Sequence, residues 1–166
     1  LFAAACVCLV EIHYERKKNE ASILKEIERQ QLRLRLQRDE MTGAYNRKAL
    51  HDALRDMESD ESGDSFVFVV VDIDNFKTIN DQYGHLVGDR FLVEFVKTLR
   101  LYCADTSVFR YGGDEFCLFF RNESLDAVIE ICRNIQGKLN QITFADLPGA
   151  TLLASFGIAV YSNQDN

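Results

Sequence analysis

Apolar and polar residues alternate along this chain with periods that predict a mixed α and β domain. Residues 66–71, Phe-Val-Phe-Val-Val-Val, form a short apolar run rich in β-branched and aromatic side chains, as expected of a buried strand. Residues 88–103 and 124–140 carry apolar side chains at helical spacing, which predicts two helices that each bury one face. Further strands are expected at 108–111, 116–120 and 152–161.

Two shorter helices complete the expected order of elements. Asn46 is placed as the N-cap of a helix that runs to about Met57, and a short helix is expected near 75–82. A polar loop over 58–64 separates the first of these helices from the buried strand. From the buried strand onward, the order β-α-α-β-β-α-β predicts an α+β fold, in which a ferredoxin-like sheet is packed against helices.

The N-terminal quarter has a different pattern. Residues 11–38 contain no proline or glycine and mix charges of both signs, which predicts a long exposed helix. This stretch is interpreted as a parallel coiled-coil linker, and a single solvated helix is the alternative. A weak heptad pattern runs through Val10, Leu24, Ile27, Leu34 and Met41, with polar interruptions at Lys17, Glu20, Gln31 and Arg38.

Residues 1–10 are wholly apolar but too few to cross a bilayer, which takes about 20 residues. Basic residues at 16–18 follow them, as on the cytoplasmic side of a membrane span. We expect the tail end of a truncated transmembrane helix here, since the chain begins with Leu1 rather than Met. A buried or partner-facing helix start is the alternative.

Composition narrows the functional class. At 166 residues with 47% hydrophobic content, the chain has room for one packed domain and an attached helix. The net charge of −7 argues against a nucleic-acid surface, because no basic face accumulates. The five cysteines show no Cys-x-x-Cys spacing and are interpreted as reduced thiols of a cytosolic domain; they are Cys6, Cys8, Cys103, Cys117 and Cys132.

Candidate chemistry lies in two acidic clusters. Asp72 and Asp74 end the buried strand, where carboxylates are costly unless they face solvent, a metal or a partner. Gly112 and Gly113 suit the two central positions of a hairpin turn and leave the backbone open to a phosphate, with two acids following at 114–115. A polar hairpin tip is the alternative for the second cluster alone. Together the clusters are typical of a two-metal nucleotidyl-transfer site.

These segments resemble the GGDEF family of diguanylate cyclases, and the resemblance covers the chain from about residue 38 to its C-terminus. The strand acids begin a run that resembles the family's first motif, and the glycine hairpin matches the motif that names the family. The segments that carry the resemblance are 39–47 (Asp-Glu-Met-Thr-Gly-Ala-Tyr-Asn-Arg), 72–89 (Asp-Ile-Asp-Asn-Phe-Lys-Thr-Ile-Asn-Asp-Gln-Tyr-Gly-His-Leu-Val-Gly-Asp), 110–116 (Arg-Tyr-Gly-Gly-Asp-Glu-Phe) and 155–159 (Ser-Phe-Gly-Ile-Ala).

The resemblance implies a palm-type nucleotidyl-cyclase fold over 39–166 and assigns roles to the acids. Asp72, Asp114 and the backbone carbonyl of Ile73 would hold Mg²⁺, with Mn²⁺ as an alternative. Asp114 would also accept a proton, and Glu115 would share in binding the metal.

On the substrate side, Asn80 and Asp89 resemble the family's guanine-binding residues. Lys77 resembles a triphosphate contact, with a free surface lysine as the alternative. His85 either touches substrate or makes a structural hydrogen bond. Asp74 and Asp81 are left as capping or solvated acids.

The implied reaction condenses two GTP into cyclic di-GMP with release of pyrophosphate, at the interface of two domains. The resemblance therefore implies a homodimer, joined through the 11–38 helix, in the cytoplasmic part of an inner-membrane signalling protein. Two departures are expected to matter. Cys103 and Thr106 stand where many members carry an Arg-x-x-Asp product-inhibition motif, with Asp105 one place off, so no such inhibition is expected. The family also continues into a further helix and strand beyond Asn166, which could leave the chain weak or inactive.

Three rival functions stay open at this point. The domain could be a regulatory module that binds GTP or a cyclic dinucleotide without catalysis, although Asp72, Asp114 and Glu115 are all present. It could accept bases other than guanine, which Asn80 with Asp89 argues against. It could also act only as an oligomerising output of a membrane sensor.

Overall fold

The computed structural model describes residues 2–59, 62–104, 107–144, 147 and 149–162, and it divides into two units at residues 37 and 38. The first unit is one helix, α1 (Phe2–Leu36), whose side chains are described from His13 onward. This confirms the long N-terminal helix, which extends further toward the N-terminus than the 11–38 prediction. Within the described residues, no helix is long and apolar enough to cross a membrane.

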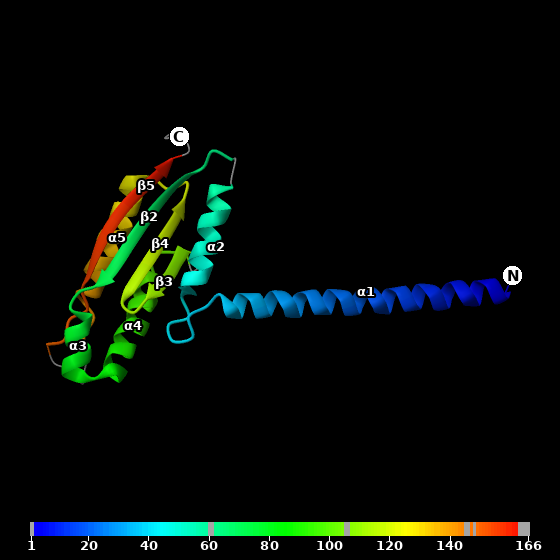
Figure 1. Cartoon of the computed structure of the whole chain (residues 1–166), viewed down its shortest axis with the longest axis horizontal. Helices are drawn as coiled ribbons and strands as arrows, with labels where there is room; N and C mark the ends of the chain where they lie inside the picture. The colour runs from blue at the N-terminus through cyan, green and yellow to red at the C-terminus, as the bar shows by residue number, and fades with distance from the viewer. Residues whose placement is uncertain (1, 60–61, 105–106, 145–146, 148, 163–166) are drawn as a thin grey trace. The chain divides into compact units, whose positions relative to one another are not determined.

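The second unit is built on a five-stranded sheet in the order β1-β3-β4-β2-β5 (Figure 1). All pairs are antiparallel except β1 with β3. The two-residue strand β1 was not predicted, because a Tyr-Asn pair is too short to show periodicity. The strands are β1 (Tyr45–Asn46), β2 (Ser65–Ile73), β3 (Val108–Gly112), β4 (Glu115–Arg121) and β5 (Ala154–Ser162).

Four helices accompany the sheet, and the predicted order of elements is confirmed with β1 added. Asn46 caps its helix as predicted, because its side chain accepts a hydrogen bond from the N–H of Ala49 at 3.0 Å. The helix predicted over 88–103 instead begins at His85, directly after Gly84, whose φ is +85°. The helices are α2 (Arg47–Glu58), α3 (Phe76–Tyr83), α4 (His85–Leu99) and α5 (Leu125–Leu139).

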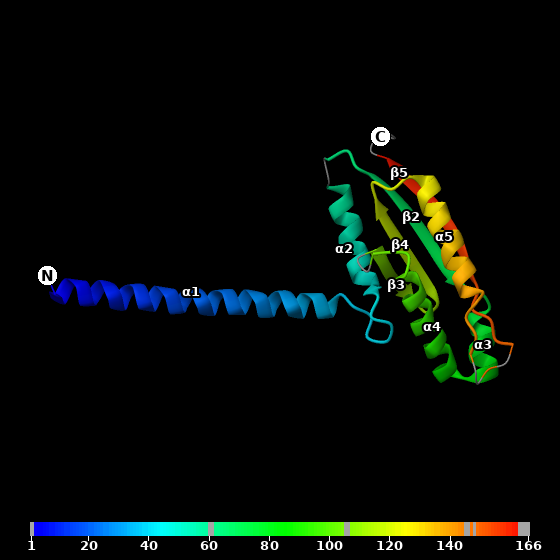
Figure 2. The same cartoon turned by 180° about the vertical axis from the view of Figure 1, so that it is seen from behind.

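The two faces of the sheet are covered unequally (Figures 1 and 2). Helices α4 and α5 lie on one face over the main core, where Phe95 and Phe116 pack with ring centroids 4.9 Å apart. Helix α2 lies on the other face over a smaller cluster around Leu50 and Phe109. Helix α3 lies beyond the end of β2, so the segment that follows the strand acids is held at that end of the sheet.

The hairpin turn differs from the sequence prediction by one residue. Gly113 and Asp114 occupy its central positions, whereas Gly112 is the last residue of β3 and pairs with Glu115. Gly113 has φ of +55°, the sign expected at the first central position of a type II′ turn. The shift arises from a bulge at Tyr111, since Arg110 pairs with Phe116 and Gly112 with Glu115.

Candidate metal and nucleotide site

The acidic clusters meet because of the register of three strands. Asp72 in β2 lies directly opposite Glu115 in β4 and directly opposite Ser155 in β5. Residues opposed in an antiparallel pair share one face of the sheet, so these three side chains form a row across it. Asp114 lies in the adjacent turn, and its carbonyl accepts a hydrogen bond from the N–H of Ile73 at 3.4 Å.

The surroundings of this row disfavour ionisation of its central carboxylate, Asp72. Desolvation raises the pKa of Asp72 above its ordinary value, and the negative charges of Asp114, Glu115 and Asp74 raise it further. The ionised form of Asp72 is therefore disfavoured by its surroundings. A divalent cation beside these carboxylates would reverse that effect, because it favours the ionised form of each.

The oxygen donors at this site suit a metal ion for which the protein supplies only part of the ligand shell. Among the residues that the structure describes, no three His, Cys, Asp or Glu side chains converge as a complete metal site. Mg²⁺ commonly takes one or two carboxylates and completes its shell with water and substrate phosphates. Asp72 and Asp114, with the backbone oxygen of Ile73, would supply such a partial set of hard oxygen donors.

Asp74 is a link between strands rather than a cap or a solvated acid. Its Oδ1 accepts a hydrogen bond from Ser155 Oγ at 2.7 Å, and its N–H donates to the carbonyl of Leu153 at 3.0 Å. These bonds join the end of β2 to β5 directly beside Asp72. Ser155, which the sequence suggested only as part of a nearby strand, therefore helps to hold the acidic row.

The predicted guanine-binding residues come from the α3–α4 pair. Asn80 and Asp89 are both half-buried, whereas Lys77 and His85 are exposed. Gly88, which precedes Asp89, packs so closely on Asn80 that a Cβ at this position would lie 1.9 Å from Asn80 Oδ1. The amide of Asn80 is thus seated against the backbone of α4, and the sequence prediction had given Gly88 no role.

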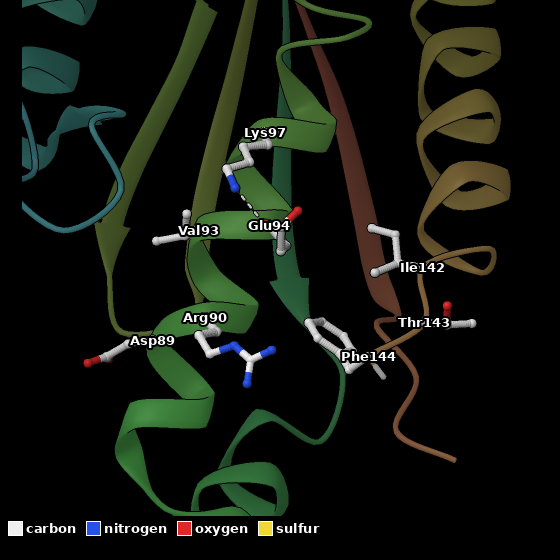
Figure 3. Close-up of a pocket in the computed structure, with 8 residues that line it drawn as sticks. All are labelled: Asp89, Arg90, Val93, Glu94, Lys97, Ile142, Thr143 and Phe144. Carbon is white, nitrogen blue, oxygen red and sulfur yellow. Dashed lines mark hydrogen bonds and ion pairs between the residues drawn. The ribbon is translucent and has the colours of Figure 1, made fainter. Parts of the chain in front are cut away.

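A cavity of about 520 Å³ lies between α4 and the segment that follows α5 (Figure 3). Asp89 is on its rim, and none of the acids at 72 or 114–115 lines it. Arg90 lies over the ring of Phe144 at 5.9 Å, and Lys97 is paired with Glu94. The cavity therefore adjoins one of the two predicted guanine-binding residues but not the acidic row.

Arg110 ties the hairpin to the start of the domain, a role that the sequence had not suggested. Its Nε and Nη2 donate to the carbonyl oxygen of Gly113 at 3.0 and 2.8 Å, and its Nη1 donates to Asp39 Oδ1 at 2.9 Å. The Arg110 side chain is only 11% exposed. Nearby, the guanidinium of Arg47 stacks over the ring of Tyr111 at 4.5 Å. The segment 38–47 thus contacts the hairpin at two points.

Asp39 is held ionised within this arrangement. Burial acts to raise the pKa of Asp39, but hydrogen bonds from the hydroxyl and N–H of Thr42 and from Arg110 outweigh it, so the pKa lies below its ordinary value. Because the folded pKa is depressed, Asp39 contributes stability above its unfolded pKa and loses it as the pH falls through the folded pKa.

We therefore expect Asp39→Asn to lower the free energy of unfolding by about 1–2 kcal/mol at neutral pH, because the partly buried Arg110 loses its charged partner. Urea unfolding at pH 7 and at about pH 3 measures the effect, and the difference from the parent should shrink at the lower pH. Asp64→Asn, which breaks a more exposed pair with Arg121, should cost less. An equal loss at both pH values would contradict an electrostatic role for Asp39.

Of Cys103, Asp105 and Thr106, which were predicted to replace the product-inhibition motif, the structure describes only Cys103. Cys103 is buried, whereas positions 105 and 106 lie outside the described residues.

Cys103, Cys117 and Cys132 are free thiols, as predicted. Burial raises the pKa of Cys103 to about 12 and that of Cys132 to about 11, so both stay protonated.

The fold and the acidic row define the class of palm-type nucleotidyl-transfer domains. Within that class, residues 36–166 match the sequence profile of "Diguanylate cyclase, GGDEF domain", and the chain belongs to this family. It is 31% identical over 125 residues to diguanylate cyclase VdcA of Vibrio cholerae, an alignment that covers 72% of this chain and 36% of VdcA. It is 34% identical over 131 residues to the probable diguanylate cyclase DgcC of Escherichia coli, covering 76% and 35%.

Solved structures agree with this assignment. The coiled coil and GGDEF domain of DgcB from Caulobacter crescentus, in complex with c-di-GMP, superimposes with a TM-score of 0.77 at 26% identity. That alignment covers 93% of this chain and 84% of the DgcB chain. The mixed sheet and the predicted palm fold are therefore confirmed. The chain spans about a third of the length of the curated relatives that it matches.

Proposed function

We propose that the chain is the catalytic domain of a diguanylate cyclase, which joins two GTP molecules into cyclic di-GMP and releases pyrophosphate. The observation that carries this proposal is the strand register that sets Asp72 opposite Glu115, with Asp114 in the adjoining turn. Family membership supports it, since curated relatives carry the same activity in their names.

In this proposal Asp72, Asp114 and the carbonyl of Ile73 hold Mg²⁺, for which Mn²⁺ can substitute. The metal, when bound, neutralises phosphate charge and lowers the pKa of the attacking hydroxyl. Asp114 takes the proton from the 3′-hydroxyl of one GTP as it attacks the α-phosphorus of the other. Glu115 shares the cation. Desolvation and the neighbouring negative charges raise the pKa of Asp72, and the repulsion between these carboxylates favours binding of a cation.

Guanine recognition is assigned to the α3–α4 pair. The Asp89 carboxylate accepts hydrogen bonds from guanine N1–H and the 2-amino group, neither of which adenine offers. The contact with Gly88 holds Asn80 against the same part of α4. Lys77, which is exposed, reaches the triphosphate, and His85 contacts the substrate from the start of α4. Gly112 and Gly113 leave the backbone open to a phosphate.

Each domain binds one GTP, so two chains must face each other to close the ring. We assign dimerisation to α1, on which apolar side chains stay exposed, including Leu24, Ile27 and Leu34. The related DgcB structure, described as a coiled coil with a GGDEF domain, supports this assignment.

Attachment to the inner membrane through the apolar residues 1–10, with the catalytic domain in the cytoplasm, is part of the same proposal.

Product analysis tests the proposal. Purified protein incubated with GTP and Mg²⁺ should form cyclic di-GMP and pyrophosphate, and the same protein with ATP should form no cyclic dinucleotide. Asp114→Ala should lose at least about 100-fold in rate yet stay folded, because residue 114 lies in a turn and is only half-buried. A folded, dimeric protein that binds GTP but forms no product would overturn the proposal in favour of a nucleotide-binding regulatory module.

A further inference from the structure

We propose that Arg110 is a positioning residue that orients one peptide of the hairpin turn, so that the N–H of Asp114 forms a fixed donor for a phosphate oxygen. This inference rests on the proposed function for the identity of the substrate. Its geometry, however, comes entirely from the hairpin and the segment 38–47.

The guanidinium of Arg110 is fixed at both ends. Two of its nitrogens converge on the carbonyl oxygen of Gly113, and the third donates to the Asp39 carboxylate. The N–H of Thr42 donates to the same Asp39 oxygen at 2.9 Å, which holds that carboxylate in place. A planar fork of this kind fixes both the position and the direction of its acceptor, which the single ammonium of lysine does not do.

Holding the Gly113 carbonyl also sets the direction of the next N–H. The described part of the chain contains no cis peptide bond, so the Gly113–Asp114 peptide is trans and planar. Its C=O and N–H point in opposite directions, and the N–H of Asp114 therefore points away from Arg110. No backbone carbonyl among the described residues accepts a hydrogen bond from this N–H.

The space around the turn is open to a ligand. A Cβ added at Gly112 or Gly113 would meet no heavy atom within 4 Å. Gly113 needs to be glycine because its φ is +55°, but Gly112 has neither a positive φ nor a crowded Cβ position. The fold itself therefore does not require glycine at residue 112. Free approach of a ligand to the backbone beside Asp114 accounts for a glycine there.

The arrangement places an N–H donor and a carboxylate of the same residue at one turn. The carboxylate of Asp114 lies in the turn beside the acidic row, where its negative charge acts on Asp72, and the N–H of Asp114 lies on the side opposite to Arg110. A phosphate whose oxygen accepts from this N–H is held next to the cation that the carboxylates bind. A donor fixed in advance costs no reorganisation during the reaction, so its loss should lower kcat more than it raises KM.

The test compares Arg110→Lys with Arg121→Lys. The second variant replaces the guanidinium that pairs with Asp64 at the far end of the same hairpin, so it controls for a general effect of exchanging arginine for lysine. In a ¹⁵N-labelled protein, the Asp114 amide resonance should shift on adding magnesium pyrophosphate, relative to Mg²⁺ alone. We expect this shift to be largely lost in Arg110→Lys and kept in Arg121→Lys. The kcat with GTP should fall about tenfold in Arg110→Lys only.

The two readouts separate failure of the inference from failure of the proposed function. If the parent makes no cyclic di-GMP, but its Asp114 amide responds to pyrophosphate and Arg110→Lys abolishes the response, the positioning role stands without the cyclase activity. An unchanged amide response in folded Arg110→Lys would overturn the positioning role, whatever its kcat. Gly112→Ala gives an independent check, since it should fold normally and weaken the same response.

Discussion

Asp72→Asn is expected to reduce cyclic di-GMP formation at least about 1000-fold while leaving the melting temperature unchanged or slightly higher. The loss of activity follows from the position of Asp72 at the centre of the acidic row, opposite Glu115 and Ser155. Without its carboxylate, the proposed metal site would lack one ligand, and the negative charge on the oxygens of the α-phosphate would be neutralised less well during attack. Asparagine has nearly the same shape, so packing is kept.

The expected effect on stability has the opposite sign to that of most substitutions, which destabilise the fold. The pKa of Asp72 is raised in the folded state, so its ionisation destabilises the fold as the pH rises through that pKa. Asparagine removes this penalty. The effect should be small, because Asp72 is exposed and solvent screens its charge.

Thermal unfolding with and without Mg²⁺, together with product analysis, checks both parts of this prediction. The parent should gain stability from Mg²⁺ by mass action, and Asp72→Asn should gain less. Glu123→Gln removes one negative charge from an exposed position beyond β4 and should leave both activity and the Mg²⁺ response unchanged. If Asp72→Asn stays active, Asp72 is not a ligand of the metal. If Asp72→Asn does not fold, Asp72 is needed for the stability of the sheet, which contradicts this prediction.

The elements that could be predicted from sequence are those that bury a continuous face. Strand β2 extends one residue before and two residues beyond the predicted run 66–71, and the run itself could be predicted because its apolar side chains have no other stable location. The bulge at Tyr111 and strand β1 could not be predicted, since both depend on pairing with a distant partner. The turn was misplaced by one residue for the same reason. Two adjacent glycines predict a turn, but only the register with β4 decides which of them is central.

The same distinction applies to the site. Asp72 and Asp114 could be proposed because Asp72 lies near the end of a recognisable strand and Asp114 lies just before another, and an antiparallel pairing of those strands brings them together. The contact between Arg110 and Asp39 spans 71 residues and leaves no periodic signal. The contact between Gly88 and Asn80 is closer in sequence, but it depends on the angle between α3 and α4. The helix was predicted to begin at residue 88, and only the structure places Gly88 inside α4, where a glycine costs about 1 kcal/mol without a packing reason.

That glycine leads to the second large effect: Gly88→Ala should weaken GTP binding about 10- to 100-fold with little loss of stability. A Cβ at residue 88 would lie 1.9 Å from Asn80 Oδ1 and 3.2 Å from Phe76 Cζ. The amide of Asn80 ends a flexible side chain, so it would rotate away and lose its place against the backbone of α4 at Gly88. Alanine also favours the helix over glycine, which offsets part of the cost of the contact with Phe76.

Titration of GTP by calorimetry, in the presence of a divalent cation, measures this effect. Gly137→Ala is the matched control, because this second helical glycine has no heavy atom within 4 Å of its Cβ position. It should raise the melting temperature slightly and leave GTP affinity unchanged. The double variant Asn80→Ala/Gly88→Ala should bind GTP as weakly as Asn80→Ala alone, since the methyl group then has no amide to displace. Additive losses would mean that Gly88 affects GTP binding by a route other than Asn80. Unchanged GTP affinity in Gly88→Ala would mean that Asn80 does not bind guanine.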